Sequence, residues 1–291
     1  MLGPMRILHL ADLHLPGSPG KLLHGVNPYA NLAEAVAVIR KQVPAPDLVV
    51  LGGDLLEDGE HSSYQAVLDL FKDLKVPVHA VLGNHDSLAG FRKTAQPPRG
   101  PEFPGYYSFD LKGVHFVMLY SGCPGKEFGR LEERQLLWLN EDLHRNSQKQ
   151  VLVFLHHPPF DTGVGWLDKL KLADADGFWE IIPPYSRNIL GVFAAHLHLQ
   201  HTCLHRGVVA ASCPAVSWQF NSNADSPRTA ISEEPPGFNL IDLAGGSLAL
   251  RTVRFCPLKP PAEAHAGRQP AEKAATPANA ATPANSATAP G

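Results

Sequence analysis

Five short polar segments carry the residues of this sequence whose types and spacing could do chemistry. They are Asp12-Leu13-His14, Gly52-Gly53-Asp54, Gly83-Asn84-His85-Asp86, His156-His157-Pro158-Pro159 and His196-Leu197-His198. Together they offer carboxylates, one amide and several imidazoles, which is a mixed set of oxygen and nitrogen donors. Such a set suits iron, manganese, zinc or cobalt, whereas calcium and magnesium prefer oxygen and structural zinc prefers thiolate. The segments therefore predict a transition-metal site.

The elements that must position these segments are buried strands. Each segment follows a short apolar run, and ligands of α/β proteins bind beyond the carboxyl ends of strands, where loops converge. Strand alternation would place both side chains of Asp12-x-His14, and both of His196-x-His198, on one face. Taken singly, Asp12 reads as a helix cap and Asp54 as a turn residue. Only the complete set favours metal binding.

Strands and helices alternate along the first two thirds of the chain. The predicted strands cover 6–10, 48–51, 78–82, 115–120, 151–155 and 189–194, and the predicted helices cover 31–43, 62–74 and 134–145. A closing hairpin is expected from 237–243 and 247–255 around Gly245-Gly246. The pattern indicates an α/β protein. Two sheets packed face to face with helices outside fit this order, although the pattern alone does not fix the topology.

Residues 257–291 differ in composition from the rest of the chain. They are rich in Ala, Pro and Thr, and the sequence Ala-Thr-Pro-Ala-Asn occurs twice. Dense Pro breaks any Ala-driven helix, and no large apolar side chain follows Leu258. We therefore expect a catalytic domain over residues 1–256 and a disordered tail over residues 257–291.

The composition excludes several classes of protein. The formal net charge is −3, and no apolar run of about 18 residues exists, so neither a nucleic-acid groove nor a membrane span is expected. Four cysteines without C-x-x-C spacing argue against a disulfide scaffold. No secretory signal is visible at the start of the sequence. The expected location is the reducing cytoplasm.

The order Asp-x-His, Gly-Asp, Gly-Asn-His-Asp, His and His-x-His resembles the calcineurin-like binuclear metallophosphoesterase superfamily. The stretches that resemble its class III cyclic-nucleotide phosphodiesterases are His156–Pro159, Gly165–Asp168, Cys213–Ala215, Gln219-Phe220 and Pro236–Phe238. The resemblance spans about residues 5–255. It implies a four-layer α-β-β-α sandwich of two mixed sheets flanked by helices, together with two iron, manganese, zinc or cobalt ions per chain.

The resemblance also implies a role for each motif residue. The first metal site would use Asp12, His14, Asp54 and His198, and the second would use Asp54, Asn84, His156 and His196. A metal-bridging hydroxide would attack phosphorus in line while Asn84 contacts the phosphate. His85 would protonate the leaving oxygen and Asp86 would steady His85. His157 has no metal role in the family, and we expect it to support a ligand or to pack.

One position departs from the family pattern, and three further side chains allow two interpretations. Ala195 stands where the family has Gly, and Gly could allow positive φ or a close backbone approach there. We expect an altered metal affinity or reaction rate at most, with the chemistry retained. Trp166, His201 and Phe220 could line a pocket, but core packing is an equally good reading, so they stay outside the predicted site.

The sequence analysis thus predicts a phosphodiester hydrolase that acts on a small molecule, with 3′,5′-cyclic AMP as the favoured substrate. A glycerophosphodiesterase or a broad-specificity phosphodiesterase is the alternative. A DNA-repair-type nuclease, suggested by the opening Arg6–His14, and a non-catalytic scaffold rank below these. The sequence is compatible with any of the four metals and with a homo-oligomer.

Overall fold

Two large sheets dominate the computed structural model, which describes residues 3–58, 64–94, 104–223 and 231–256. The first sheet has the order β13-β12-β1-β2-β3, built from β1 (Met5–Leu10), β2 (Leu48–Leu51), β3 (Val78–Ala80), β12 (Gly237–Ala244) and β13 (Ser247–Arg254). The second has the order β4-β5-β6-β7-β9-β8, built from β4 (Tyr107–Leu111), β5 (Val114–Met118), β6 (Gln150–Phe154), β7 (Ile189–Ala194), β8 (His201–His205) and β9 (Val208–Ser212). A separate small pair consists of β10 (Gln219–Phe220) and β11 (Ile231–Ser232).

Both sheets are mixed. The strands β1, β2 and β3 are parallel to one another, and so are β5, β6, β7 and β9. In contrast, β12 runs antiparallel to β1, and β4 and β8 run antiparallel to their neighbours at the two edges of the second sheet. Because parallel strands end at the same edge of a sheet, the loops after β1, β2 and β3 lie together, and so do those after β6 and β7.

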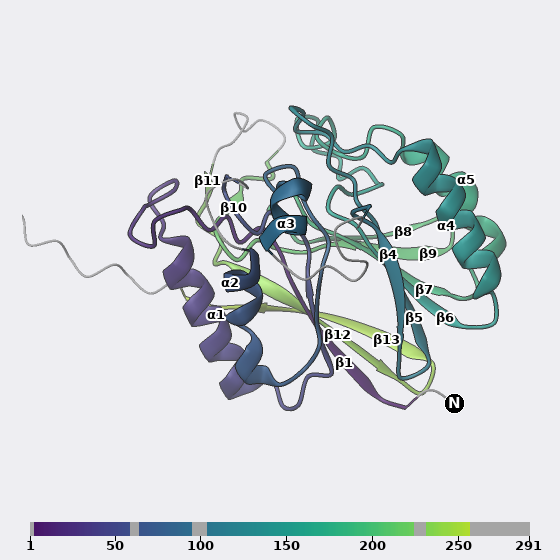
Figure 1. Cartoon of the computed structure of the whole chain (residues 1–291), viewed down its shortest axis with the longest axis horizontal. Helices are drawn as coiled ribbons and strands as arrows, with labels where there is room; N and C mark the ends of the chain where they lie inside the picture. The colour runs from purple at the N-terminus through teal and green to yellow at the C-terminus, as the bar shows by residue number, and fades with distance from the viewer. Residues whose placement is uncertain (1–2, 59–63, 95–103, 224–230, 257–291) are drawn as a thin grey trace, which may run out of the picture. The chain divides into compact units, whose positions relative to one another are not determined.

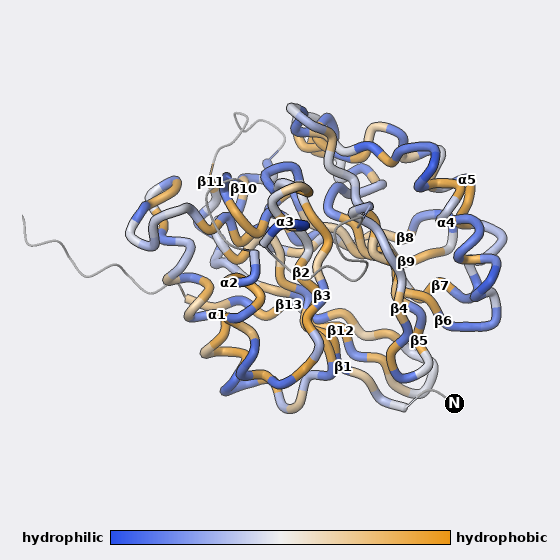
Figure 2. The backbone as a smooth tube through the Cα atoms, in the orientation of Figure 1, coloured by the Kyte–Doolittle hydropathy of each residue, from blue (hydrophilic) through white to orange (hydrophobic). Residues whose placement is uncertain are grey.

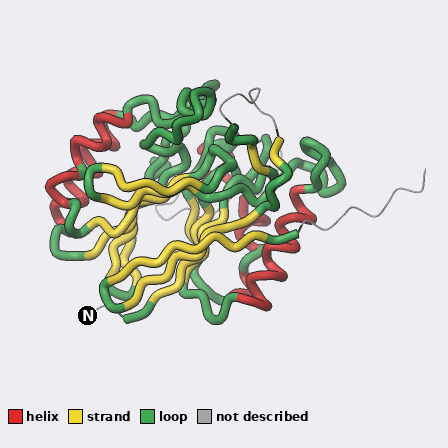
Figure 3. The backbone as a smooth tube through the Cα atoms, turned by 180° about the vertical axis from the view of Figure 1, so that it is seen from behind, coloured by secondary structure: helices red, strands yellow, loops and turns green. Residues whose placement is uncertain are grey.

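Helices cover the outer face of each sheet (Figures 1 and 3). On the first sheet these are α1 (Pro28–Gln42), α2 (Tyr64–Asp69) and α3 (Leu88–Thr94). On the second they are α4 (Glu133–Arg145) and α5 (Ala175–Ile181), and short 3₁₀ turns occur at Lys72–Leu74 and Pro183–Tyr185. The α-β-β-α order of layers that the resemblance implied is confirmed.

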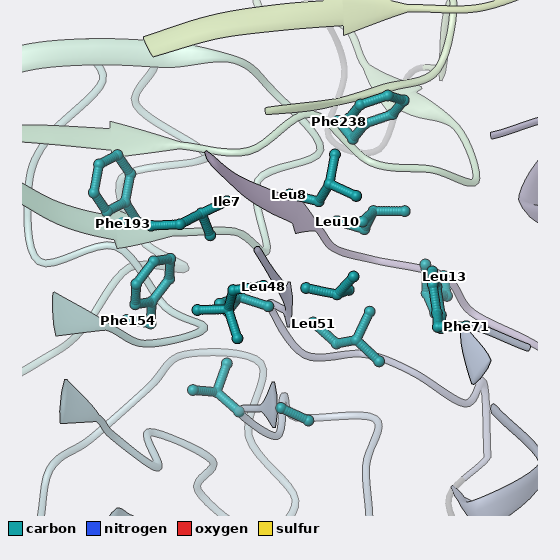
Figure 4. Close-up of a cluster of buried hydrophobic side chains, with 14 of the residues drawn as sticks. Ile7, Leu8, Leu10, Leu13, Leu48, Leu51, Phe71, Phe154, Phe193 and Phe238 are labelled. Atoms are coloured by element: carbon teal, nitrogen blue, oxygen red, sulfur yellow. The ribbon is translucent and has the colours of Figure 1, made fainter. Parts of the chain in front are cut away.

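The hydrophobic core between the sheets follows from strand alternation. In β6, Leu152 and Phe154 join the cluster between the sheets, whereas Val151 and Val153 join the cluster beneath α4 and α5. Figure 4 shows part of the first cluster, and Figure 2 shows hydrophobic stretches along the central strands. Each fully buried side chain of this size stabilises the fold by roughly 1.5–3 kcal/mol.

All three predicted helices differ from the observed ones at their ends, and the one predicted over 134–145 differs only in beginning at Glu133. The helix predicted over 31–43 begins at Pro28, because the side chain of Asn27 caps it by accepting a hydrogen bond from the backbone N–H of Ala30 at 3.1 Å. The helix predicted over 62–74 has residues 62–63 outside the described part. Its α-helical stretch ends at Asp69, and the 3₁₀ turn that follows leads into Lys75, whose backbone is left-handed at φ 55°.

Hydrogen bonds between the two sheets bring their carboxyl edges together. The Nδ1 of His156, after β6, lies 2.8 Å from the carbonyl oxygen of Gly52, after β2. The backbone N–H of His196, after β7, donates to both carboxylate oxygens of Asp12, after β1, at 3.2 Å. The loops of one sheet are therefore fixed directly against those of the other.

Some expectations concern features of the chain other than its layers. The tail predicted over 257–291 lies outside the described residues. No helix in the described part is long and apolar enough to cross a membrane. All four cysteines are free thiols.

A buried histidine ties α4 to the second sheet. His115 of β5 is 4% exposed, and its ring nitrogens lie 2.7 Å from Asp110 of β4 and 2.7 Å from Asp142 of α4. Burial by itself would lower the pKa of His115, but its hydrogen bonds with Asp142 and Asp110 raise that pKa above its ordinary value. Lys149 also pairs with Asp110.

This histidine predicts a pH-dependent contribution to stability. Because the pKa of His115 is higher in the folded state than in the unfolded state, the stabilisation is complete below about pH 6.5 and is lost as the pH rises through the folded-state value. The free energy of unfolding of the wild type minus that of His115→Gln should therefore be largest near pH 6 and fall by pH 9. Urea titrations at both pH values measure it, and a difference that does not change with pH would contradict the prediction.

Candidate metal centre

The structure brings all five polar segments to one place. Reactive atoms of Asp12, His14 and His198 lie within 4.8 Å of one another, as do those of Asp12, Asp54 and His156. These five side chains are at most 3% exposed, and His196 is 7% exposed. Charged and polar groups are this deeply buried only when they are paired or bind a ligand.

Asp54 lies between two groups of donors. Its Oδ2 is 3.7 Å from the Nε2 of His14 on one side and 3.1 Å from the Nε2 of His156 on the other. Its Oδ1 accepts a hydrogen bond from the backbone N–H of His85 at 2.9 Å. One carboxylate oxygen therefore faces both predicted sites, which is the arrangement that a bridging ligand needs.

Hydrogen bonds fix the tautomers of three of the four predicted histidine ligands. A carbonyl or ionised carboxylate oxygen only accepts, so the ring nitrogen beside it must carry the proton. His156 donates from Nδ1 to the carbonyl of Gly52 at 2.8 Å, and His198 donates from Nδ1 to that of Trp218 at 2.8 Å. His14 donates from Nδ1 to Glu57 at 2.7 Å. When neutral, each ring therefore keeps a lone pair on Nε2, as metal-binding histidines do. The Nε2 of His156 also lies 3.1 Å from the Oδ2 of Asp54, so a cation that binds there would displace the proton shared between them.

Ring nitrogens of the four predicted histidine ligands lie close together in two pairs. The Nε2 atoms of His14 and His198 are 3.0 Å apart, and the Nε2 of His156 is 3.2 Å from the Nδ1 of His196. Two donors about 2.1 Å from one ion at a right angle are separated by about 3 Å, so both spacings suit a shared cation. The Oδ1 of Asn84 is buried without a hydrogen-bond partner in the described part of the chain. The residues present thus fit a binuclear metal centre.

The electrostatics of the cluster reflect its burial. Burial by itself would raise the pKa of Asp54, but the neighbouring His156 holds it well below its ordinary value. The pKa of His156 is raised to about 9, because the attraction of Asp54 outweighs the burial that opposes its charge. Burial lowers the pKa of His196 to about 3 and raises the pKa of Asp12. A cluster of this kind stabilises positive charge around Asp54.

The backbone of the site is left-handed at five of the predicted ligands. The φ values are 52° at Asp12, 47° at His14, 49° at Asp54, 71° at His196 and 45° at His198. The pairs Asp12-x-His14 and His196-x-His198 therefore lie in turns beyond the strand ends. The side chains of each pair converge because of these turns and not because of strand alternation. Such conformations cost of order 1–3 kcal/mol each and persist where surrounding contacts enforce them.

Two glycines leave the space that the ligands occupy. A Cβ at Gly83 would overlap with the Oδ1 of Asp54 and lie 2.7 Å from the Nε2 of His156. Gly53 has φ +98°, and a Cβ there would overlap with the ring of His156. The glycines of the Gly-Asp and Gly-Asn-His-Asp segments are thus required by close packing around Asp54 and His156.

The neighbouring motif residues are placed as follows. The ring of His85 is 37% exposed, and its Nδ1 donates to the carbonyl of Glu57 at 3.0 Å. The carboxylate of Asp86 accepts from the backbone N–H groups of Leu55, Leu56 and Gly83. Asp86 therefore joins the loop after β2 to the loop after β3, and this joint sets the position of His85 through the backbone.

His157 and Ala195 are packed beside the centre. His157 is fully buried, its Nδ1 lies 2.8 Å from the Oγ of Ser121, and its ring centroid is 4.3 Å from that of His196. Ala195 is fully buried against Ala11 and Cys213. It is absent from the residues with positive φ, so the methyl group that replaces the family glycine imposes no left-handed strain.

Two contributors to the site were not expected from the sequence. Glu57 orients His14 through its carboxylate and His85 through its carbonyl, and the carbonyl of Trp218 orients His198. Glu57 follows Asp54 by three residues, and nothing in its spacing distinguishes it from an ordinary surface glutamate. A backbone carbonyl leaves no signal in a sequence at all.

The family comparison agrees with the geometry. Residues 5–200 match the model of the calcineurin-like phosphoesterase family. The chain is 26% identical over 260 residues to a 3′,5′-cyclic-nucleotide phosphodiesterase of Nostoc sp., covering 89% of this chain and 96% of that protein. It is 28% identical to a protein of Arcobacter nitrofigilis named "probable glycerophosphodiester phosphodiesterase", covering 81% of this chain and 88% of that protein.

Solved structures share the fold at lower identity. A dimetal phosphatase from Danio rerio superposes with a TM-score of 0.60 at 17% sequence identity, covering 85% of this chain and 95% of that one. At this identity the likeness concerns the fold alone.

The packing around Gly83 predicts how the centre can be disrupted. In Gly83→Ala the new methyl group would displace the carboxylate of Asp54, so the purified variant should retain less than one metal ion per chain, against two for the wild type. Elemental analysis measures the metal content, and circular dichroism checks the fold. Gly20→Ala is the matched control, because a Cβ at that position meets nothing within 4 Å. Full metal content in Gly83→Ala would show that the close packing is not needed.

Proposed function

The chain belongs to the calcineurin-like phosphoesterase family, and from that premise we propose that it hydrolyses 3′,5′-cyclic nucleotides, with cyclic AMP as the favoured substrate. Members of this family use a binuclear metal centre, and the chain is a metal-dependent phosphodiester hydrolase. The observation that carries the proposal is the position of the Asp54 Oδ2, which faces His14 on one side and His156 on the other. Every other ligand position of the family pattern also holds a residue that can bind a metal. The name of the Nostoc relative supports the choice of substrate.

The proposed ligands fall into two sets that share Asp54. Asp12, His14, Asp54 and His198 would hold one ion, and Asp54, Asn84, His156 and His196 would hold the other. When bound, two such ions would act as Lewis acids on the phosphoryl oxygens and would make water nucleophilic at neutral pH. The chain contributes the fixed lone pairs on the Nε2 atoms of His14, His156 and His198, and the amide oxygen of Asn84. In this proposal the amide NH2 group of Asn84 also donates to the phosphate.

His85 is the proposed proton donor to the leaving oxygen. Its Nδ1 proton is held by the carbonyl of Glu57, so the proton that the ring gains and loses is on Nε2. The ring is partly exposed and lines the cavity beside Asp54 and Asn84. In this role Asp86 acts on His85 through the backbone rather than by touching its ring.

Glycerophosphodiester hydrolysis is the second candidate function, because one relative carries that name. A broad-specificity phosphodiesterase would share the same centre. We further propose that the protein acts in the reducing cytoplasm, which is supported by its four free cysteines.

A comparison of substrates tests the proposed function. Protein loaded separately with manganese, zinc, cobalt or iron is assayed on 3′,5′-cyclic AMP, 2′,3′-cyclic AMP, glycerophosphoethanolamine and bis(p-nitrophenyl) phosphate. We expect the highest kcat/KM on 3′,5′-cyclic AMP. A higher value on glycerophosphoethanolamine would select the second candidate. Absence of turnover on all four substrates with both metals bound would contradict both candidate functions.

The role of His85 is tested by comparing leaving groups. His85→Ala should lower kcat on 3′,5′-cyclic AMP by about 10²–10⁴-fold, because an alkoxide needs a proton, and should affect bis(p-nitrophenyl) phosphate far less, because nitrophenolate does not. His144→Ala, on the exposed face of α4, is the control. Equal losses on both substrates, with metal content intact, would remove His85 from this role.

A further inference from the structure

The cavity beside the candidate metal centre has two chemically different parts. It encloses about 170 Å³. Donors of the centre line one part, including Asp54, Asn84 and His196, and four apolar side chains, Trp166, Leu170, Trp218 and Phe220, line the other. We call Trp166, Trp218 and Phe220 the aromatic wall.

The aromatic wall begins at the proposed ligands themselves. The ring of Phe220 stacks on that of His198, with centroids 4.5 Å apart and planes at 29°. The ring of Trp218 lies 4.7 Å from that of His14 and 5.0 Å from that of His198. A substrate whose phosphate reaches the centre must therefore place one of its ester groups near these rings.

The segment that carries Trp218 and Phe220 is fixed by the centre. The carbonyl of Trp218 accepts from the Nδ1 of His198, and the backbone N–H of Phe220 donates to the carbonyl of His198 at 3.2 Å. The position of these two rings relative to the centre is thus set by hydrogen bonds rather than by loop packing alone.

The loop that carries Trp166 is also held rigidly. Both oxygens of Asp168 accept from the turn that precedes Trp166, from the backbone N–H of Thr162 at 2.7 Å and that of Gly163 at 3.1 Å. Beneath the loop, Trp166 and Phe220 pack on a small apolar cluster of Val164, Leu167 and Leu197. Their rings meet edge to face, with centroids 5.4 Å apart and planes at 76°. Such a wall is formed before any ligand binds, which lowers the entropic cost of binding.

The chemistry of the wall indicates what it binds. The Nε1 atoms of Trp166 and Trp218 are buried without a hydrogen-bond partner in the described part of the chain, and the rest of each ring is carbon surface. Aromatic surface binds flat rings by stacking and binds organic cations through its π face. Two divalent ions beside the wall would repel a cationic group on the substrate, which favours an uncharged ring.

We propose that the aromatic wall is the subsite for the nucleobase of the substrate, and that Trp166 and Phe220 determine the preference for base-bearing phosphodiesters over glycerol esters. This inference rests on the proposed function, because it assigns a part of the same cavity. It goes further by naming side chains that select the substrate without touching the phosphate.

A pair of substrates that differ only in the base tests the wall. The metal-loaded protein is assayed on 3′,5′-cyclic AMP and on methyl β-riboside 3′,5′-cyclic phosphate, which has the same reacting group and no base. The wild type should prefer cyclic AMP by roughly tenfold in kcat/KM, as expected for one stacked base. Trp166→Leu should bring this ratio close to one, whereas Trp166→Phe, which keeps a ring, should preserve most of it.

The control and the contradicting outcomes are as follows. Trp138→Leu removes a tryptophan of α4 that packs on Tyr106, outside the residues that line the cavity, and should leave the ratio unchanged. The same ratio in the wild type and in Trp166→Leu would overturn the proposal. So would a preference for glycerophosphocholine that Trp166→Leu abolishes, since the wall would then bind a cation.

Binding measured without turnover separates this proposal from the proposed function. Calorimetry of the metal-loaded wild type should show tighter binding of 5′-AMP than of ribose 5-phosphate by roughly tenfold. Equal affinities for 5′-AMP and ribose 5-phosphate would contradict the proposal that the aromatic wall binds the base, even if all the phosphodiesters are hydrolysed. If 5′-AMP binds about tenfold more tightly but bis(p-nitrophenyl) phosphate is not hydrolysed, the proposed function is contradicted while the assignment of the aromatic wall still holds.

Discussion

Burial of the Asp54 carboxylate is the constraint on which the rest of the site depends. An ionised carboxylate that is 2% exposed costs several kcal/mol unless hydrogen bonds and positive charge surround it. The structure supplies a backbone N–H from His85 on one oxygen and imidazoles on the other. Glycine at positions 53 and 83 is needed because any Cβ there would occupy the space that these groups share. The left-handed backbone at Asp54 and at four of its partners is strain that this packing maintains.

The site is connected to the fold mainly through backbone carbonyls. Gly52 fixes the tautomer of His156, Trp218 fixes that of His198, and Glu57 fixes that of His85. Gly52 and Glu57 follow a strand of the first sheet, and Trp218 follows a strand of the second. The lone pairs therefore converge only if the two sheets pack against each other in one particular arrangement. The hydrophobic core between the sheets, with Ile7, Phe154 and Phe193 among its members, therefore also serves the chemistry.

The segment from Trp218 to Phe220 combines two tasks. Its backbone holds His198, and its side chains form part of the wall of the cavity. A change in side chain at Phe220 can thus alter which ester group the cavity accepts while the backbone contact to His198 remains.

The sequence by itself determined the identity of the candidate ligands and most elements. The segments that hold Asp12, His14, Asp54, Asn84, His156, His196 and His198 could be found because each follows a strand whose apolar run is visible in one dimension. The resemblance to the family then separated these candidate ligands from their neighbours. The strands β2 and β7 were predicted with the observed bounds. The roles of these residues as ligands stay proposals. Helix ends were less predictable, because they depend on caps such as Asn27 and on one left-handed residue, Lys75.

Only the tertiary structure decided how these residues are oriented. The convergence of Asp12 with His14 comes from left-handed turns, and Asp86 joins two loops instead of contacting His85. The orienting roles of Glu57 and Trp218, and the wall beside them, join residues that are distant along the chain or act through the backbone. Residue types and local periodicity are written in one dimension, whereas tautomers, backbone strain and cavity walls are set by contacts that exist only once the two sheets have packed.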